Sequence, residues 1–320
     1  MGEFNVNKVL VTGASGFLGR HLMPVLRARY GDRAVIGVSS RDYDLMNPAA
    51  CREMFETHRP DVFVHLAAYS GGIGANRTYP ADFYFRNTIL TAHGFQYAAE
   101  FNVKKMVYPM GGCSYPATAR SPIDEAQMWE GYPQAESAGY SAAKKMGLVA
   151  SQSYRQQYGL KTSVVIPGNL YGEYDNFSRL DSHVVPAMLR RYYEAKLDGA
   201  PKVVMWGSGR PTRDFVYAAD VAAVFPFFIE EYDSTEPVNI SSGTTTSIRE
   251  LAETIRTITG YDGQIEWDMT KPDGQMFKIF DVSRLHGLGL TCATPLVEGL
   301  RRTFAWFSRH YADQSDGIRL

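Results

Sequence analysis

A tyrosine followed four positions later by a lysine, Tyr140 and Lys144, is the clearest sign of chemistry in this sequence. On a helix, this spacing puts both side chains on one face. An ammonium group beside a phenol favours the phenolate and lowers the phenol pKa from about 10. Tyr140 is therefore predicted to exchange a proton with a carbonyl or hydroxyl oxygen.

A glycine-rich turn near the N-terminus indicates a partner for that proton transfer. The apolar segment 8–12 runs into Gly13, Gly16 and Gly19 in the pattern GxxGxxG. Gly13 permits a tight turn, Gly16 lets the backbone approach a pyrophosphate, and Gly19 lets helix and strand pack closely. The first amides of the following helix then face the phosphates. This context predicts a bound dinucleotide, which exchanges hydride while Tyr140 exchanges the proton.

The residues after the second predicted strand bear on the choice between NAD and NADP. An acidic side chain there would bind the ribose diol, but the segment reads Ser39-Ser40-Arg41. Arg41 can pair with a 2′-phosphate, which favours NADP(H) over NAD(H). The alternative is that Arg41 is a solvated loop residue. Asp44 follows and is expected beside the adenine.

The elements that must position these residues alternate between strands and helices. Apolar, β-branched runs predict buried strands at 8–12, 34–38, 61–66, 105–109 and 162–167, and helical patterns lie at 17–30, 47–58, 80–101 and 138–159. Such alternation predicts an α/β fold, a Rossmann-type doubly wound parallel sheet, in residues 1–170. Residues 171–320 are expected to form mainly a smaller substrate-binding domain, interleaved with the first, with helices at 247–259 and 295–310. Segments 203–206 and 238–240 are candidates to rejoin the main sheet.

Composition excludes several classes of protein. The 320 residues are 45% hydrophobic, and the formal net charge is −1, which gives no electrostatic footprint for nucleic acid or an anionic membrane. A membrane span is not expected, because no apolar run reaches about 18 residues, and residues 1–7 lack the pattern of a signal peptide. The three cysteines, Cys51, Cys113 and Cys292, show no CxxC spacing, so neither a disulfide framework nor a metal site is expected. A cytoplasmic location is the default expectation.

Further motifs extend from residue 65 almost to the end of the chain. They are HLAA at 65–68, GGIGAN at 71–76, CSYP at 113–116, PGNLYG at 167–172, DNF at 175–177, SHVVP at 182–186, WGSG at 206–209, RDF at 213–215, KPDG at 271–274 and DVSRL at 281–285. With the glycine turn and the Tyr140/Lys144 pair, they resemble the extended short-chain dehydrogenase/reductase (NAD-dependent epimerase/dehydratase) family, and specifically the GDP-L-fucose synthase family. That family carries out 3,5-epimerisation and 4-keto reduction of GDP-4-keto-6-deoxy-mannose with NADPH.

The resemblance implies a role for each matching residue. Tyr140 is the reductase acid and Lys144 its orienting cation, while Cys113 and His183 match the base and acid of the epimerisation. The implied cofactor contacts are Gly13, Gly16, Phe17, Leu18, Gly19, Arg41, Asp44, Leu66, Ala67, Ala68, Asn87, Tyr140, Lys144, Pro167, Asn169, Leu170 and His183. The implied substrate contacts are Asn169, Arg191, Trp206, Arg213 and Lys278. By analogy, a homodimer through helices 80–101 and 138–159 is expected.

One departure from the family pattern concerns the reaction itself. Gly111 stands where the family has a serine that donates a hydrogen bond to the substrate oxygen, and loss of such a donor typically costs about 10²–10³ in rate. Ser114 or a water could replace it, although strand alternation would point Ser114 to the opposite face. Alternatively, epimerisation is retained without net reduction, or a different sugar, such as a heptose, fills the gap. A non-catalytic nucleotide-sensing or scaffold protein is the hypothesis from another class, which the retained Tyr140 and Cys113 oppose.

Overall fold

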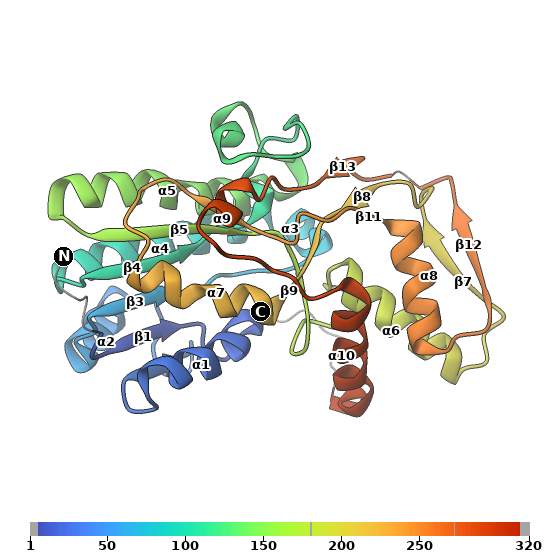
Figure 1. Ribbon diagram of the computed structural model, residues 1–320, viewed down its shortest axis with the longest axis horizontal. Helices are drawn as coiled ribbons and strands as arrows, with labels where there is room; N and C mark the ends of the chain where they lie inside the picture. Colours follow the sequence, from blue (N-terminus) through green and yellow to red (C-terminus); the bar gives the residue numbers. More distant parts are fainter. Residues whose placement is uncertain (1–5, 180, 272, 314–320) are drawn as a thin grey trace.

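The structure is a computed structural model that describes residues 6–179, 181–271 and 273–313, and its centre is a six-stranded parallel sheet (Figure 1). The strand order is β10-β5-β4-β3-β1-β2, and every neighbouring pair is parallel. The strands are β1 (Val9–Thr12), β2 (Val35–Val38), β3 (Val62–His65), β4 (Lys105–Pro109), β5 (Lys161–Pro167) and β10 (Val238–Ile240). The prediction of a Rossmann-type, doubly wound α/β fold is confirmed.

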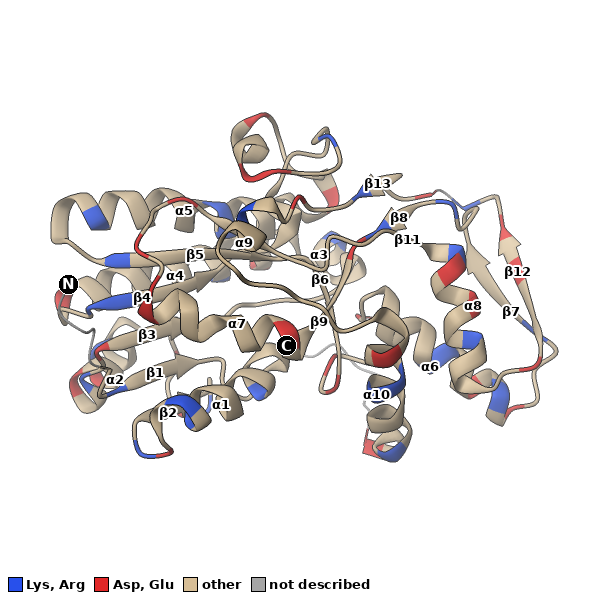
Figure 2. Ribbon diagram, in the orientation of Figure 1, with Lys and Arg blue, Asp and Glu red and all other residues tan. Residues whose placement is uncertain are grey.

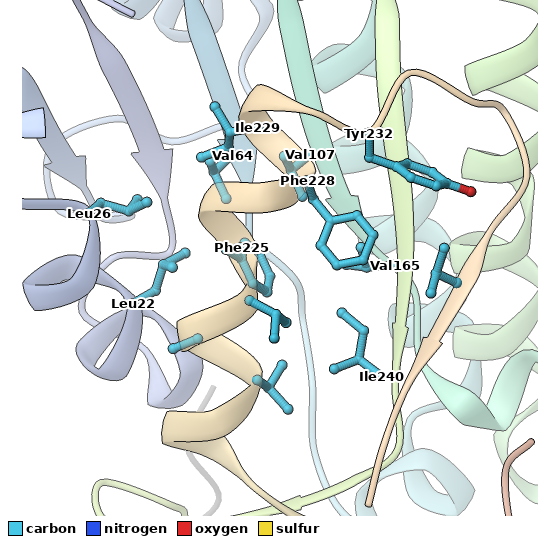
Figure 3. Close-up of a cluster of buried hydrophobic side chains, with 14 of the residues drawn as sticks. Leu22, Leu26, Val64, Val107, Val165, Phe225, Phe228, Ile229, Tyr232 and Ile240 are labelled. Carbon is cyan, nitrogen blue, oxygen red and sulfur yellow. The ribbon is translucent and has the colours of Figure 1, made fainter. Parts of the chain in front are cut away.

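Helices cover both faces of this sheet because its strands are apolar on both sides. On one face, α1 (Phe17–Tyr30) and α7 (Ala218–Glu230) pack over alternate strand residues such as Val9 and Val11. Figure 3 shows Phe225 and Phe228 of α7 against the sheet, with Leu22 of α1 beside them.

The opposite face is covered by α2 (Pro48–His58), α4 (Pro80–Glu100) and α5 (Ala138–Tyr158), whose Phe55, Phe95 and Leu148 pack over Leu10. These helices agree with the predicted ranges to within one or two residues. Their ends have local causes, since the Asn47 side chain caps α2 by accepting from Ala49 N, and Gly159 ends α5 with a φ of 73°. The short α3 (Ile73–Thr78) precedes α4.

Part of the C-terminal half builds a second lobe, seen at the right of Figure 1. Its helices are α6 (Val184–Leu197), α8 (Ile248–Thr259) and α10 (Leu296–Arg309), whereas the short α9 (Ser283–Gly287) lies against β10 of the main sheet. Its strands are β6 (Asn169–Tyr171), β7 (Lys202–Trp206), β8 (Thr212–Arg213), β9 (Phe215–Tyr217), β11 (Thr246–Ser247), β12 (Gln264–Asp268) and β13 (Phe277–Lys278). They pair as β11-β8-β13, β12-β7 and β6-β9.

Two segments of this half were candidates to rejoin the main sheet, and they behave differently. Segment 238–240 does rejoin it, as β10 beside β5. Segment 203–206 does not, because its strand, β7, pairs in parallel with β12 in the second lobe. The alternation of buried and exposed residues along β7 fits a strand covered on one face only.

Charged residues of both signs are spread over both lobes (Figure 2). In the described part of the chain, no helix combines the length and apolarity that crossing a membrane requires.

Candidate active site

A cavity of about 810 Å³ opens at the C-terminal ends of β1, β3, β4 and β5. Parallel α/β sheets bind ligands at this edge, near the point where the strand order reverses, and here β1 pairs with both β2 and β3. The sequence-predicted residues that line it are Gly13, Gly16, Phe17, Leu18, Gly19, Asp44, Leu66, Ala67, Ala68, Cys113, Tyr140, Lys144, Pro167, Asn169, Leu170, His183 and Lys278. Arg41, Asn87, Arg191, Trp206 and Arg213 lie outside this lining.

The glycine turn has little room for side chains. Gly13 adopts a φ of +68°, and a Cβ there would lie 2.9 Å from Ala67 N. A Cβ on Gly19 would collide with the Gly13 carbonyl and lie 2.6 Å from the Ala14 carbonyl oxygen. Gly16 is the N-cap of α1 and makes no side-chain cap, so the first amides of the helix are left for a ligand. The turn therefore fits the diphosphate of a dinucleotide.

The segment after β2 forms the rim of the cavity. Ser39 donates from its backbone amide and its hydroxyl to the Asp42 carboxylate, each at 2.8 Å. Ser39 and Ser40 line the cavity, and Arg41 stands on the exposed turn beside them.

Asn87 acts from behind the cavity wall. Its side-chain oxygen accepts from Tyr69 N at 3.0 Å, and its amide donates to the Tyr69 and Phe83 carbonyls at 2.9 and 2.7 Å. Asn87 is buried and fixes the backbone that follows Ala68. Its contact with the cavity is indirect.

Tyr140 and Lys144 both reach the cavity from α5. Lys144 Nζ lies 4.1 Å from the centroid of the Tyr108 ring, and burial lowers the pKa of Lys144 to about 7. Burial raises the pKa of the Tyr140 phenol, and the nearby Cys113 acts in the same direction. This is opposite to the expected lowering by Lys144. Tyr140 therefore holds its proton, as a proton donor must.

Cys113, His183 and Lys278 line the same cavity, although they come from three distant parts of the chain. Cys113 lies in a short 3₁₀ turn after β4, His183 directly precedes α6, and Lys278 belongs to β13. Burial lowers the pKa of His183, and the Lys278 charge adds to that effect. Burial lowers the pKa of Lys278, and its electrostatic interaction with Cys113 acts in the opposite direction.

Comparison with known proteins identifies the family of this chain. Residues 9–241 match the model of the NAD dependent epimerase/dehydratase family. The chain belongs to that family.

Its relatives in the family are similar over nearly their whole length. GDP-L-fucose synthase 1 of Arabidopsis thaliana is 36% identical, with 96% of this chain and 95% of the relative covered. GDP-L-fucose synthase of Escherichia coli (strain K12) is 37% identical, with 94% and 96% covered.

Solved structures of enzymes named for GDP-linked sugars superpose on nearly the whole chain. A GDP-6-OMe-4-keto-L-xylo-heptose reductase from C. jejuni superposes with a TM-score of 0.88 at 25% identity, covering 97% of this chain and 100% of that one. A GDP-L-fucose synthetase from Naegleria fowleri bound to NADP has a TM-score of 0.87 at 27% identity, with 98% of each chain covered.

In this epimerase/dehydratase, the other sequence-predicted substrate residues lie on the second lobe. Arg213 pairs in register with the cavity-lining Lys278, across β8 and β13. The Arg213 guanidinium is held by the carbonyls of Thr212 and Gln275, at 2.7 and 2.6 Å. Arg191 Nη1 donates to the Val204 carbonyl at 3.1 Å, and Trp206 is 68% exposed. These three residues extend from the cavity along the second lobe.

The gap at Gly111 faces two of the predicted catalytic residues. A Cβ on Gly111 would lie 3.1 Å from Cys113 Sγ, 3.3 Å from Tyr140 Cε1 and 3.8 Å from the Tyr140 hydroxyl. Ser114 does not replace the missing hydroxyl, because it is fully buried and donates to the Ser141 carbonyl at 3.3 Å. Strand alternation does not explain its direction, because residues 112–114 form a 3₁₀ turn and both Gly111 and Ser114 face α5.

Sequence reasoning missed Tyr69, Arg86 and Asp181. Tyr69 and Arg86 line the cavity, and Asp181 Oδ1 accepts from Gly72 N at 2.7 Å, tying the GGIGAN loop to the segment that carries His183. Arg86 could have been found from its position, because it lies four residues before the cavity-lining Leu90 and so shares its side of α4. Asp181 gives no such local signal, because its partner is 109 residues away.

Proposed function

We propose that this protein is an NADP(H)-dependent enzyme that epimerises and reduces a GDP-linked 4-keto sugar. The observation that carries the proposal is the meeting of Tyr140, Lys144, Cys113 and His183 in one cavity, which also contains the glycine turn. The GDP-L-fucose synthase relatives, at 36 and 37% identity, and the NADP-bound N. fowleri structure support the nucleotide, the sugar class and the cofactor.

In the reduction step, NADPH supplies a hydride to the carbonyl carbon when it is bound. Tyr140 donates its proton to the carbonyl oxygen, so the ketone becomes an alcohol. The raised pKa of Tyr140 keeps this proton available. Lys144 orients the site, and its interaction with Cys113 favours its cationic form against the effect of burial.

In the epimerisation step, Cys113 removes a proton from a carbon next to the carbonyl. The negative charge moves onto the carbonyl oxygen, and His183 returns a proton to the opposite face of that carbon. Lys278 interacts electrostatically with Cys113 in the same cavity. The lowered pKa of His183 makes its imidazolium a stronger proton donor.

Gly111 favours a second candidate: epimerisation without net reduction, or reduction of a different sugar such as a heptose. The space beside Gly111 can hold a substrate group instead of a serine hydroxyl. Two C. jejuni structures, at 25 and 26% identity, are named as a GDP-linked 4-keto-heptose reductase and a GDP-mannoheptose C4 reductase.

Incubation with GDP-4-keto-6-deoxy-mannose and NADPH in deuterated buffer tests both candidates. The proposal expects solvent deuterium at C3 or C5 together with NADPH oxidation. Deuterium without oxidation would support the epimerase alone. If several GDP-linked 4-keto sugars gave neither signal, the proposal would be wrong.

The assembly, location and division of the chain are further parts of the proposal. We propose a homodimer through the outer faces of α4 and α5, where Phe85 and Met146 are 58 and 51% exposed. The charge substitution Phe85→Glu should then give a monomer by light scattering. Free thiols at all three cysteines support a cytoplasmic location. Residues 1–170 would hold the cofactor, and residues 171–320 would mainly bind the substrate.

A further inference from the structure

The cations around the cavity are unevenly distributed. Its lining contains Arg86, Lys144 and Lys278, and Asp44 is its only carboxylate among the described residues. Lys144 and Lys278 both interact electrostatically with Cys113, so they belong to the catalytic end. The glycine turn, with the sequence GASGFLG at 13–19, carries no lysine or arginine, and the adjacent Arg20 lies outside the cavity lining, where its Nε donates to the Ser15 carbonyl at 3.0 Å. Arg86 is thus the cation that the catalytic groups leave unused.

Arg86 lies over Tyr69, which belongs to the segment of the cavity lining that contacts the glycine turn. Its guanidinium carbon lies 4.6 Å from the centroid of the Tyr69 ring. Tyr69 directly follows Ala67 and Ala68, and Ala67 N lies 2.9 Å from the position of a Cβ on Gly13. Asn87 holds the Tyr69 backbone through its amide and its carbonyl. The ring that supports Arg86 is therefore fixed in position relative to the turn.

Arg86 also makes no ion pair with any residue that the structure describes. Across the described ranges, no carboxylate lies within ion-pair distance of its guanidinium. The residue is exposed at the cavity wall, so its side chain can reorient at little cost. A guanidinium pairs with phosphate oxygens through two parallel hydrogen bonds.

We propose that Arg86 binds the diphosphate of the dinucleotide and supplies the positive charge that the glycine turn lacks. The guanidinium moves from the Tyr69 ring to the phosphate oxygens, opposite the amides at the start of α1. Tyr69 holds the free guanidinium near this position, which reduces the ordering cost of binding. This inference rests on the proposed binding of NADP(H).

The test compares dissociation constants of the wild type and Arg86→Gln for NADPH, NADH and GDP, measured by calorimetry. We expect Arg86→Gln to raise the dissociation constants for NADPH and NADH by the same factor, about tenfold. The dissociation constant for GDP should not change. Arg41→Gln is the matched control, because losing its pairing with the 2′-phosphate would weaken NADPH binding and leave NADH binding unchanged. Raising the salt concentration should weaken dinucleotide binding more in the wild type than in Arg86→Gln.

Each other outcome overturns the inference. If Arg86→Gln binds both dinucleotides within twofold of the wild type, Arg86 has no role in the cofactor site. Weaker binding of NADPH alone would place Arg86 at the 2′-phosphate. Weaker binding of GDP alone would place it at the substrate site. Adenosine 2′-monophosphate, which has no diphosphate, should bind both proteins equally, so a parallel loss of its binding would show that the effect does not come from the diphosphate and would overturn the inference. If the wild type binds neither dinucleotide, the proposed function itself fails.

Discussion

Replacing Gly111 by serine would place a hydroxyl beside the Tyr140 phenol. The added Cβ would lie 3.8 Å from the Tyr140 hydroxyl, so the serine oxygen, one bond further, can come within hydrogen-bond range. The same Cβ would lie 3.1 Å from Cys113 Sγ and 3.3 Å from Tyr140 Cε1. These contacts are tight, but the thiol is the end of a flexible side chain and can shift by a few tenths of an ångström.

The expected change in reduction rate comes from comparing two variants, one that adds only a Cβ and one that adds a Cβ and a hydroxyl. Gly111→Ala adds the same contacts without a donor, so we expect it to reduce a GDP-linked 4-keto sugar no faster than the wild type. Gly111→Ser adds a donor at the carbonyl oxygen, and one such donor is worth about 10²–10³-fold in rate. Gly111→Ser should therefore exceed Gly111→Ala by about 10²-fold.

The assay is single-turnover oxidation of bound NADPH, followed by its absorbance after the keto sugar is added. Dissociation constants for NADPH should be equal in the wild type and both variants, because position 111 lies beside the catalytic groups. Equal oxidation rates in Gly111→Ser and Gly111→Ala would refute the reasoning. They would mean that a substrate group occupies the gap and that the hydroxyl has no role.

Three further predictions concern the cofactor turn, the buried lysine and the support of the Cys113 segment. Gly19→Ala should abolish NADPH binding in a folded protein, since its Cβ would meet the Gly13 and Ala14 carbonyls; calorimetry that shows binding within twofold of the wild type would contradict this. The pKa of Lys144 is about 7 in the folded state against an ordinary 10.5, so the unfolded state binds more protons between these values. The free energy of unfolding should thus rise with pH from about 7 towards 10.5 in the wild type relative to Lys144→Met, and parallel urea-unfolding curves across this range would exclude it. Tyr115→Phe removes a buried 2.6 Å hydrogen bond to Asn239 Oδ1 and should destabilise the protein by about 1–3 kcal/mol; an unchanged urea midpoint would show that the bond contributes nothing.

Local sequence patterns were sufficient for much of the fold. Strands covered on both faces are continuously apolar, and amphipathic helices repeat every three to four residues, so each could be read from a short window. The glycine turn and the Tyr140/Lys144 pair are equally local, because each lies within a single strand–turn–helix unit or a single helix. The direction of Ser114 did not follow from local alternation, because the chain leaves β4 and forms a 3₁₀ turn before it.

The sequence by itself thus determined the parallel sheet, the dinucleotide turn and the proton-donor helix. Only the tertiary structure decided which charges share the cavity, because those side chains meet through pairings between distant strands and loops. Lys278 and Cys113 interact although they lie far apart in the sequence, so no local pattern predicts their contact. Arg213 lies beside Lys278 only because β8 pairs with β13. Burial also reversed the expected direction of the Tyr140 pKa, because desolvation depends on everything packed around the phenol.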